Sequence, residues 1–154
     1  MATAYGEMRQ PGCVEALLAR VDRITPTTPR QWGVMTAHEM VVHLADSFRA
    51  VLGMRQASAV DTWFSRSVMK WGALHTPMSW PKGVPTRPEV DPKREGTKPA
   101  EFAADRDALV ALMRQFVDPA AVRTPHPFFG AMSEQDWMIW GYRHMDHHLR
   151  QFGL

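Results

Sequence analysis

Apolar side chains recur at helical spacing along most of the chain, and this pattern limits the possible folds more than any other feature. Residues three and four apart share one face of an α-helix, so such a stripe predicts a helix that buries that face. The stripes predict helices over residues 13–24, 36–55, 61–74, 99–117 and 133–152. No stretch has the alternation expected of a strand. The sequence therefore predicts an all-α bundle of four main helices, with residues 61–74 as a shorter accessory helix.

Residues with capping preferences mark the ends of two of these helices. Thr36 and Glu39 have the spacing of a capping box, in which each side chain pairs with a free backbone amide at the start of a helix. Ser133 and Asp136 mark the start of the last helix, and Gly153 is its expected stop. These signals place the second and the last helix more firmly than the others.

Residues 76–99, TPMSWPKGVPTRPEVDPKREGTKP, are rich in proline and charge. The stretch is too long for a tight turn and has too many prolines for regular structure. A loop of this kind inside a compact domain is usually functional, mobile or wrapped over the surface. Pro99 suits the first turn of the helix that follows, because proline lacks an N–H that would be unpaired there anyway.

Composition sets the broad class of protein. A chain of 154 residues with 45% hydrophobic and 22% charged residues fits one globular domain, residues 1–154. The net charge is only +2 and no basic block appears, so nucleic acid is not an expected partner. No apolar run suggests a secretory signal or a membrane span. Cys13 is the single cysteine, which excludes an internal disulfide and favours a cytoplasmic location.

The segment HEMVVH, from His38 to His43, resembles the zinc-protease signature H-E-x-x-H but has one residue too many. A helix turns by about 100° per residue, so a spacing of five separates the two rings by about 140°. They cannot readily bind one ion from a straight helix. The protease interpretation therefore fails, and either histidine would need partners from elsewhere in the chain.

The last helix offers a better pair, His144 and His148, which are four residues apart and share one face. His147 borders the same face. A third nitrogen from another helix would complete a site, with His43 the natural donor and His38, in the first turn near solvent, the poorer one. The simpler alternative is that these histidines are hydrogen-bonded core or surface residues. His75 and His126 are not expected to be ligands, and Trp137 and Trp140 are expected in the core.

A histidine in the second main helix combined with H-x-x-x-H on the final helix resembles the DinB/YfiT-like metalloenzyme superfamily. The segments GTKPAEFAADRDAL, HPFFGAMSEQDW and GYRHMDHHLRQFG look like a DinB-like subfamily of unknown function. The resemblance runs from about residue 31 to the C-terminus. It implies a four-helix bundle with one long crossover and a metal ion held by His43, His144 and His148. Members of the superfamily that the chain resembles include transferases and isomerases that use low-molecular-weight thiols. Other members have been regarded as metal-dependent hydrolases.

Three neutral imidazoles favour a divalent ion, zinc or nickel first and then iron, and leave coordination positions open for chemistry. The first hypothesis is a metal-dependent transferase with a small-molecule substrate and a thiol cofactor, because Cys13 matches no ligand position. A metal-dependent hydrolase and a non-catalytic bundle that binds a ligand or a partner are the alternatives.

Further expectations concern the surroundings of such a site. Glu39, Asp46 and His147 could lie behind the ligands, to orient an imidazole or accept a proton. For the two carboxylates the structural explanation is the stronger one: Glu39 caps the helix, and Asp46 is solvated or paired with Arg49. His147 could also take the place of His148 if the helix is rotated. The loop of residues 76–99 is expected near the mouth of the histidine site or against a second subunit, as in a homodimer.

Overall fold

Five α-helices provide the regular structure of residues 6–154, the part of the chain that the computed structural model describes. No strand occurs within that range, where an isolated bridge between His126 and Gly130 is the only β pairing. The all-α prediction is therefore confirmed for these residues. The helices are α1 (Cys13–Val21), α2 (Ala37–Val51), α3 (Lys70–His75), α4 (Phe102–Val117) and α5 (Glu134–Gln151).

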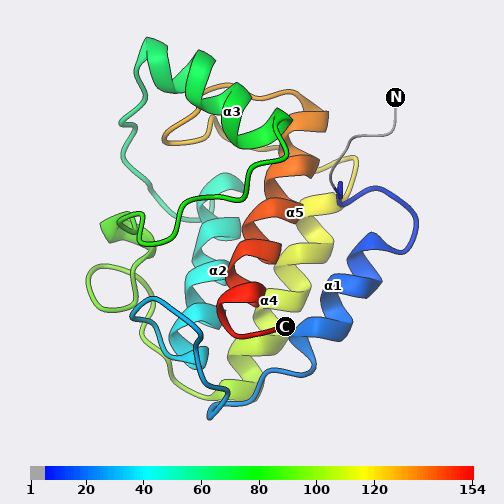
Figure 1. Cartoon of the computed structure of the whole chain (residues 1–154), viewed down its shortest axis with the longest axis vertical. Helices are drawn as coiled ribbons and strands as arrows, with labels where there is room; N and C mark the ends of the chain where they lie inside the picture. The colour runs from blue at the N-terminus through cyan, green and yellow to red at the C-terminus, as the bar shows by residue number, and fades with distance from the viewer. Residues whose placement is uncertain (1–5) are drawn as a thin grey trace.

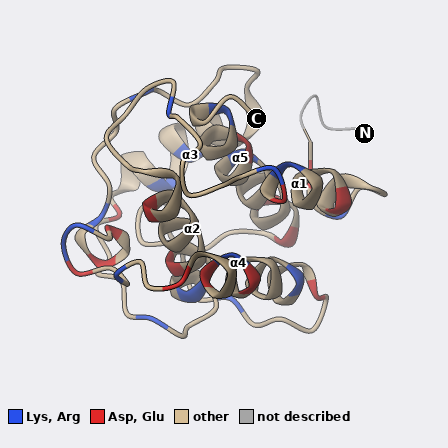
Figure 2. Cartoon of the chain, turned by 90° about the horizontal axis from the view of Figure 1, so that it is seen from below, with Lys and Arg blue, Asp and Glu red and all other residues tan. Residues whose placement is uncertain are grey.

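The long helices pack around one hydrophobic core. α2 lies against α4 and α5, and α1 lies against the same two helices on the other side (Figure 1). Seen from below, the four helices surround a common interior, and acidic and basic residues are mixed over their outer faces (Figure 2). Phe48, Phe116 and Trp140 form an aromatic cluster in that interior, with ring centroids 5.0 to 5.9 Å apart. Trp137 and Trp140 are both buried, as predicted.

Capping side chains set the starts of α2 and α5 as the sequence predicts. Thr36 accepts a hydrogen bond from the Glu39 amide, and the Glu39 side chain accepts one from the Thr36 amide. Ser133 and Asp136 form the same box on α5. α5 ends at Gln151, and Gly153 follows with a φ of 73°, a left-handed conformation that favours glycine.

Three boundaries of the long helices differ from the prediction by three residues or more. α1 ends at Val21 rather than residue 24, and α2 ends at Val51 rather than residue 55, because hydrogen-bonded turns close both ends. α4 begins at Phe102, so Pro99 lies before the helix. Glu101 decides this start, because its carboxylate accepts hydrogen bonds from two amides of the first turn.

The accessory helix has an irregular start. A π-helical segment, Ser65–Met69, leads directly into α3. The combined helical stretch ends with α3, at His75. The long crossover to α4 then covers residues 76–99 without regular structure except for one 3-10 turn, Pro88–Val90, as the proline content predicts. Among residues 6–154, no helix is both long and apolar enough to cross a membrane.

Candidate metal centre

Three histidines from two helices meet on one side of the core. His43 lies on α2, and His144 and His148 lie one turn apart on α5, so the contact between these helices brings the three rings together. One nitrogen from each ring lies within 4.8 Å of the other two. The Nε2 atoms of His43 and His148 are 3.1 Å apart. The geometry thus unites the three residues that the sequence singled out.

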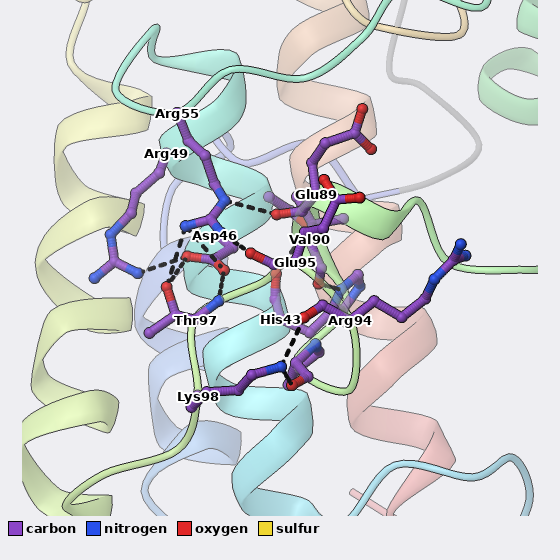
Figure 3. A network of polar contacts seen from close by, with 12 residues as sticks. His43, Asp46, Arg49, Arg55, Glu89, Val90, Arg94, Glu95, Thr97 and Lys98 are labelled. Atoms are coloured by element: carbon purple, nitrogen blue, oxygen red, sulfur yellow. Dashed lines mark hydrogen bonds and ion pairs between the residues drawn. The ribbon is translucent and has the colours of Figure 1, made fainter.

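The backbone of the crossover determines which nitrogen of His43 faces the cluster. Nδ1 lies 2.8 Å from the carbonyl oxygen of Val90, in the 3-10 turn (Figure 3). A carbonyl oxygen can only accept, so Nδ1 must carry the proton and donate it. The neutral ring then presents the lone pair of Nε2 to the cluster.

Gln151 determines the tautomer of His148 in the same way. Its amide nitrogen donates to the carbonyl oxygen of Trp32 at 3.1 Å, which orients the amide. The Gln151 Oε1 atom therefore faces Nδ1 of His148, 3.0 Å away. Because this oxygen is an acceptor, Nδ1 of His148 carries the proton. Nε2 of His148 is again a lone pair directed at the cluster.

The two lone pairs face each other at 3.1 Å, which is repulsive unless a positive charge lies between them. Two nitrogens on one tetrahedral zinc ion, with bonds of about 2.0–2.1 Å, stand about 3.3 Å apart. The observed spacing is close to that value. The nitrogens of the whole cluster lie within 4.8 Å of one another, at most about 1.5 Å more than the tetrahedral spacing, so full coordination needs a shift of up to about 1.5 Å in one ring.

Burial argues against a proton as the bridging charge. It lowers the pKa of His43, which is buried, below the ordinary value for histidine. It lowers the pKa of His144 and His148 well below that value, and the neighbouring histidines add to the effect. All three rings therefore favour the neutral form, which is the form that binds a metal ion. His144 and His148 keep some exposed surface, so the cluster is connected to solvent.

Aromatic rings position His144, the third member of the cluster. Its ring centroid lies 5.0 Å from Trp140, in the core, and 5.8 Å from Trp80, in the crossover. Trp80 is held in turn by a hydrogen bond from its Nε1 to the carbonyl oxygen of Ala73, at 2.9 Å. Val90 and Trp80 thus bring the crossover directly against the histidines, which agrees with the predicted place of this loop near the site.

His38 and His147 lie outside the cluster. His38 is half-buried rather than near solvent, and it pairs with Asp105 of α4, with 2.7 Å between Nε2 and Oδ2. The ring of His147 packs against Trp32 on another side of α5, with centroids 4.8 Å apart. α5 is rotated so that His148 rather than His147 approaches His43, and the alternative in which His147 replaces His148 does not hold.

Neither candidate carboxylate is hydrogen-bonded to His43. Glu39 caps α2 and lies 3.6 Å from the Lys93 ammonium group. Asp46 is fully buried and accepts hydrogen bonds from the amide and hydroxyl of Thr97 and from Arg49 (Figure 3). Both carboxylates therefore have structural partners, and the Val90 carbonyl orients His43 in their place.

The remaining candidates also have other partners. His75 contacts Asp136, with 2.8 Å between Nε2 and Oδ1, and Nδ1 of His126 accepts hydrogen bonds from two amides of its own loop. Cys13 is on α1 and is not part of the histidine cluster. Burial, followed by nearby glutamates, raises the pKa of its thiol, so Cys13 is a poor nucleophile.

Sequence reasoning missed Val90 and Gln151. Gln151 follows His148 by three residues on the same helix, a spacing that allows contact, so a search for side-chain acceptors one turn from each histidine would have found it. A backbone carbonyl leaves no such signal. Only the path of the crossover brings Val90 to His43.

Comparison with known proteins gives a family and no closer relative. A family model described as "Protein of unknown function (DUF1569)" matches residues 14–153, which is nearly the whole chain. No curated protein and no solved structure matches the chain. The extent of the match, which includes all three clustered histidines, places the chain in the DUF1569 family.

Proposed function

We propose that the protein is a metal-dependent enzyme that holds one divalent ion through His43, His144 and His148. The observation that carries the proposal is the 3.1 Å contact between two Nε2 atoms whose protons are both on the opposite nitrogen. A hydrogen-bonded polar core would place a donor opposite an acceptor. Two acceptors at this distance call for a cation.

The donor set favours an ion of intermediate softness. Imidazole nitrogens suit zinc, nickel and iron, and the three rings leave room for at least one further ligand. An ion in such a site is a Lewis acid that lowers the pKa of a thiol or a water molecule that binds it. The chain's own contribution is to keep the lone pairs in place through Val90 and Gln151, while Trp80 and Trp140 pack beside His144.

We infer a transferase that uses a low-molecular-weight thiol as the leading reaction class. Support comes from the arrangement expected of a DinB-like four-helix bundle: one histidine from the second main helix, two from the last, and a long crossover beside them. Cys13 lies outside the cluster, so the reactive thiol belongs to a cofactor. Hydrolysis is the second candidate, because water as a nucleophile needs neither a cysteine nor a thiol cofactor.

Metal binding is tested first, by elemental analysis of the untagged protein and calorimetric titration with Zn²⁺. The His43→Ala, His144→Ala and His148→Ala variants are each expected to lose most of the affinity. His38→Ala and His147→Ala are matched controls, because they remove an imidazole from the same two helices outside the cluster, and both should keep the ion. Loss of zinc in His38→Ala or His147→Ala, with retention in His43→Ala, would show that the ligands are assigned wrongly.

The two reaction classes are separated with cobalt-loaded protein. Addition of N-acetylcysteine should produce a sulfur-to-cobalt charge-transfer band if the open position accepts a thiol. The band should be absent from His144→Ala. A spectrum that responds to pH but not to the thiol would favour hydrolysis, and a protein that takes up no ion at all would favour the non-catalytic alternative.

A further inference from the structure

A cavity of about 630 Å³ lies beside the histidine cluster. Trp32, from the segment before α2, forms part of its wall, together with Trp80 and Lys82 of the crossover and His147 of α5. The volume falls within the roughly 300–1,000 Å³ typical of small-molecule sites. The cavity is therefore large enough for a substrate.

Two side chains separate the cavity from the cluster. The Trp80 ring centroid lies 5.8 Å from that of His144 and 5.9 Å from that of His147. The His147 ring in turn lies 5.2 Å from that of His148. Trp80 and His147 thus both contact the candidate ligands and line the cavity. A ligand in the cavity would lie one layer of side chains from the metal site.

The walls combine aromatic surface with positive charge. Trp32 packs against His147, and the Lys82 ammonium group lies 5.5 Å from the centre of the Trp32 ring. Asp146 is an acidic residue of the wall, but it is already paired with Arg20 at 2.8 Å and with Arg150 at 2.9 Å. Lys82 forms no ion pair with a carboxylate among residues 6–154. An anion that enters the cavity therefore meets Lys82, while the nearby carboxylate is neutralised.

Hydrogen bonds hold this wall in place. Arg143, buried on α5, donates to the carbonyl oxygen of Thr76 at 2.8 Å and to that of Met78. Trp80 is tied to α3 through Ala73. The start of the crossover is therefore anchored to α5 and α3 at Thr76, Met78 and Trp80, just before Lys82 in the chain. Such anchoring lowers the entropic cost of ordering a binding surface.

We propose that the cavity binds the substrate, and that this substrate is a planar small molecule with an anionic group. Its ring lies against Trp32 and Trp80, where indole surfaces favour a flat apolar partner. Its anionic group lies beside Lys82, and its other end lies toward Trp80 and His147, the side chains between the cavity and the histidine cluster. The inference rests on the proposed function for the chemistry at the histidines, whereas binding in the cavity requires no metal.

The test compares 2-naphthoate with its neutral analogue 2-naphthamide in calorimetric titrations of the metal-free full chain. Naphthoate is expected to bind about fivefold more tightly, because only the carboxylate interacts with Lys82. Lys82→Met should remove this difference and leave the affinity for naphthamide unchanged. Trp32→Ala should weaken both probes about tenfold, and Trp32→Phe, which keeps a ring, should restore most of the loss.

Two control variants remove the same side-chain types elsewhere. Lys70→Met and Trp71→Ala alter the α3 helix, where Trp71 is 62% exposed, and neither should change the binding of naphthoate. Equal affinities for the two probes, or a loss in Trp71→Ala instead of Trp32→Ala, would overturn the proposal. Zinc titration of the same samples keeps the two proposals apart. Zinc binding without naphthoate binding rejects the cavity alone, and naphthoate binding without zinc binding rejects the metal centre alone.

Discussion

At the scale of single residues, two acceptor oxygens, Val90 O and Gln151 Oε1, determine the tautomers of His43 and His148. Each accepts a hydrogen bond from Nδ1 of one histidine, and together they turn the Nε2 lone pairs of His43 and His148 toward each other. Without them, either ring could present an N–H to the other. The acceptors behind the ligands therefore orient the proposed site without binding the ion themselves.

Replacement of Gln151 by leucine tests this directly. The Gln151→Leu variant leaves Nδ1 of His148 without its acceptor, so the zinc affinity should fall by about 10–100-fold. Gln151→Glu keeps an acceptor oxygen one turn from His148 and should retain most of the affinity. Calorimetric titration of the two variants checks the prediction, and an unchanged affinity in Gln151→Leu would contradict it.

His126 makes the stability of the protein depend on pH. Burial lowers its pKa to about 4 from an ordinary value of 6.5, and Nδ1 accepts hydrogen bonds from the amides of Phe128 and Phe129. Protonation therefore favours the unfolded chain. The stabilisation is fully present above pH 6.5 and is lost as the pH falls toward 4, by at most about 3 kcal/mol.

The His126→Asn variant keeps an oxygen that can accept from the two amides but cannot take up a proton in this range. Its free energy of unfolding should decline less between pH 6.5 and pH 4 than that of the wild-type protein. Urea denaturation at several pH values measures both. Parallel curves would mean that other groups account for the loss.

The crossover is the element on which the site most depends. Residues 87–97 supply the Val90 carbonyl and attach to α2, and to Arg55 just after it, through several polar contacts (Figure 3). Asp46 is the centre of this attachment, because it accepts from the amide and hydroxyl of Thr97 at 2.7 and 2.8 Å. Arg49 and Arg55 lie close to the same carboxylate, at 2.9 and 3.5 Å.

Removal of the Asp46 carboxylate should therefore weaken the fold, because this carboxylate joins the crossover to α2. The Asp46→Ala variant leaves Thr97 and two arginines without their common partner, at a cost of about 2–4 kcal/mol in the free energy of unfolding. Asp61→Ala breaks a more exposed ion pair with Arg66 and should cost less than about 1 kcal/mol. Chemical denaturation compares the two variants. If the Asp46→Ala protein lost its zinc affinity while keeping its stability, Asp46 would support the metal ligands rather than the fold.

The proposed ion would link three parts of the whole molecule: α2, α5 and, through Val90, the crossover. An ion that binds the folded chain and not the unfolded one shifts the unfolding equilibrium. At a free zinc concentration about 100 times the Kd, the gain is about 2.7 kcal/mol, which corresponds to a rise in Tm of about 5–10 °C for a chain of this length.

Thermal unfolding with and without Zn²⁺ measures this rise, and chelation should reverse it. Mg²⁺ prefers oxygen ligands and should leave the Tm unchanged. His43→Ala should show no shift with zinc, whereas His38→Ala should respond as the wild-type protein does. A homodimer remains a prediction, and the mass of the protein in solution measures it independently.

What the sequence determined by itself was local. Capping at Thr36 and Ser133, the stop at Gly153 and the shared face of His144 and His148 depend on residues within one helical turn, and the structure has them as predicted. The rejection of a His38–His43 pair has the same origin. These features follow from the rotation per residue of a helix and from the hydrogen-bonding groups of neighbouring side chains. Both are given by the local sequence.

Only the tertiary structure decided the contacts between distant segments. The approach of His43 to His148 depends on how α2 and α5 are rotated about their axes, and the same rotation turns His147 to Trp32. The Val90 carbonyl and the attachment of Thr97 to Asp46 depend on the path of an irregular crossover. A backbone carbonyl is identical in every residue, so no side-chain pattern could have pointed to Val90, and packing alone placed it against His43.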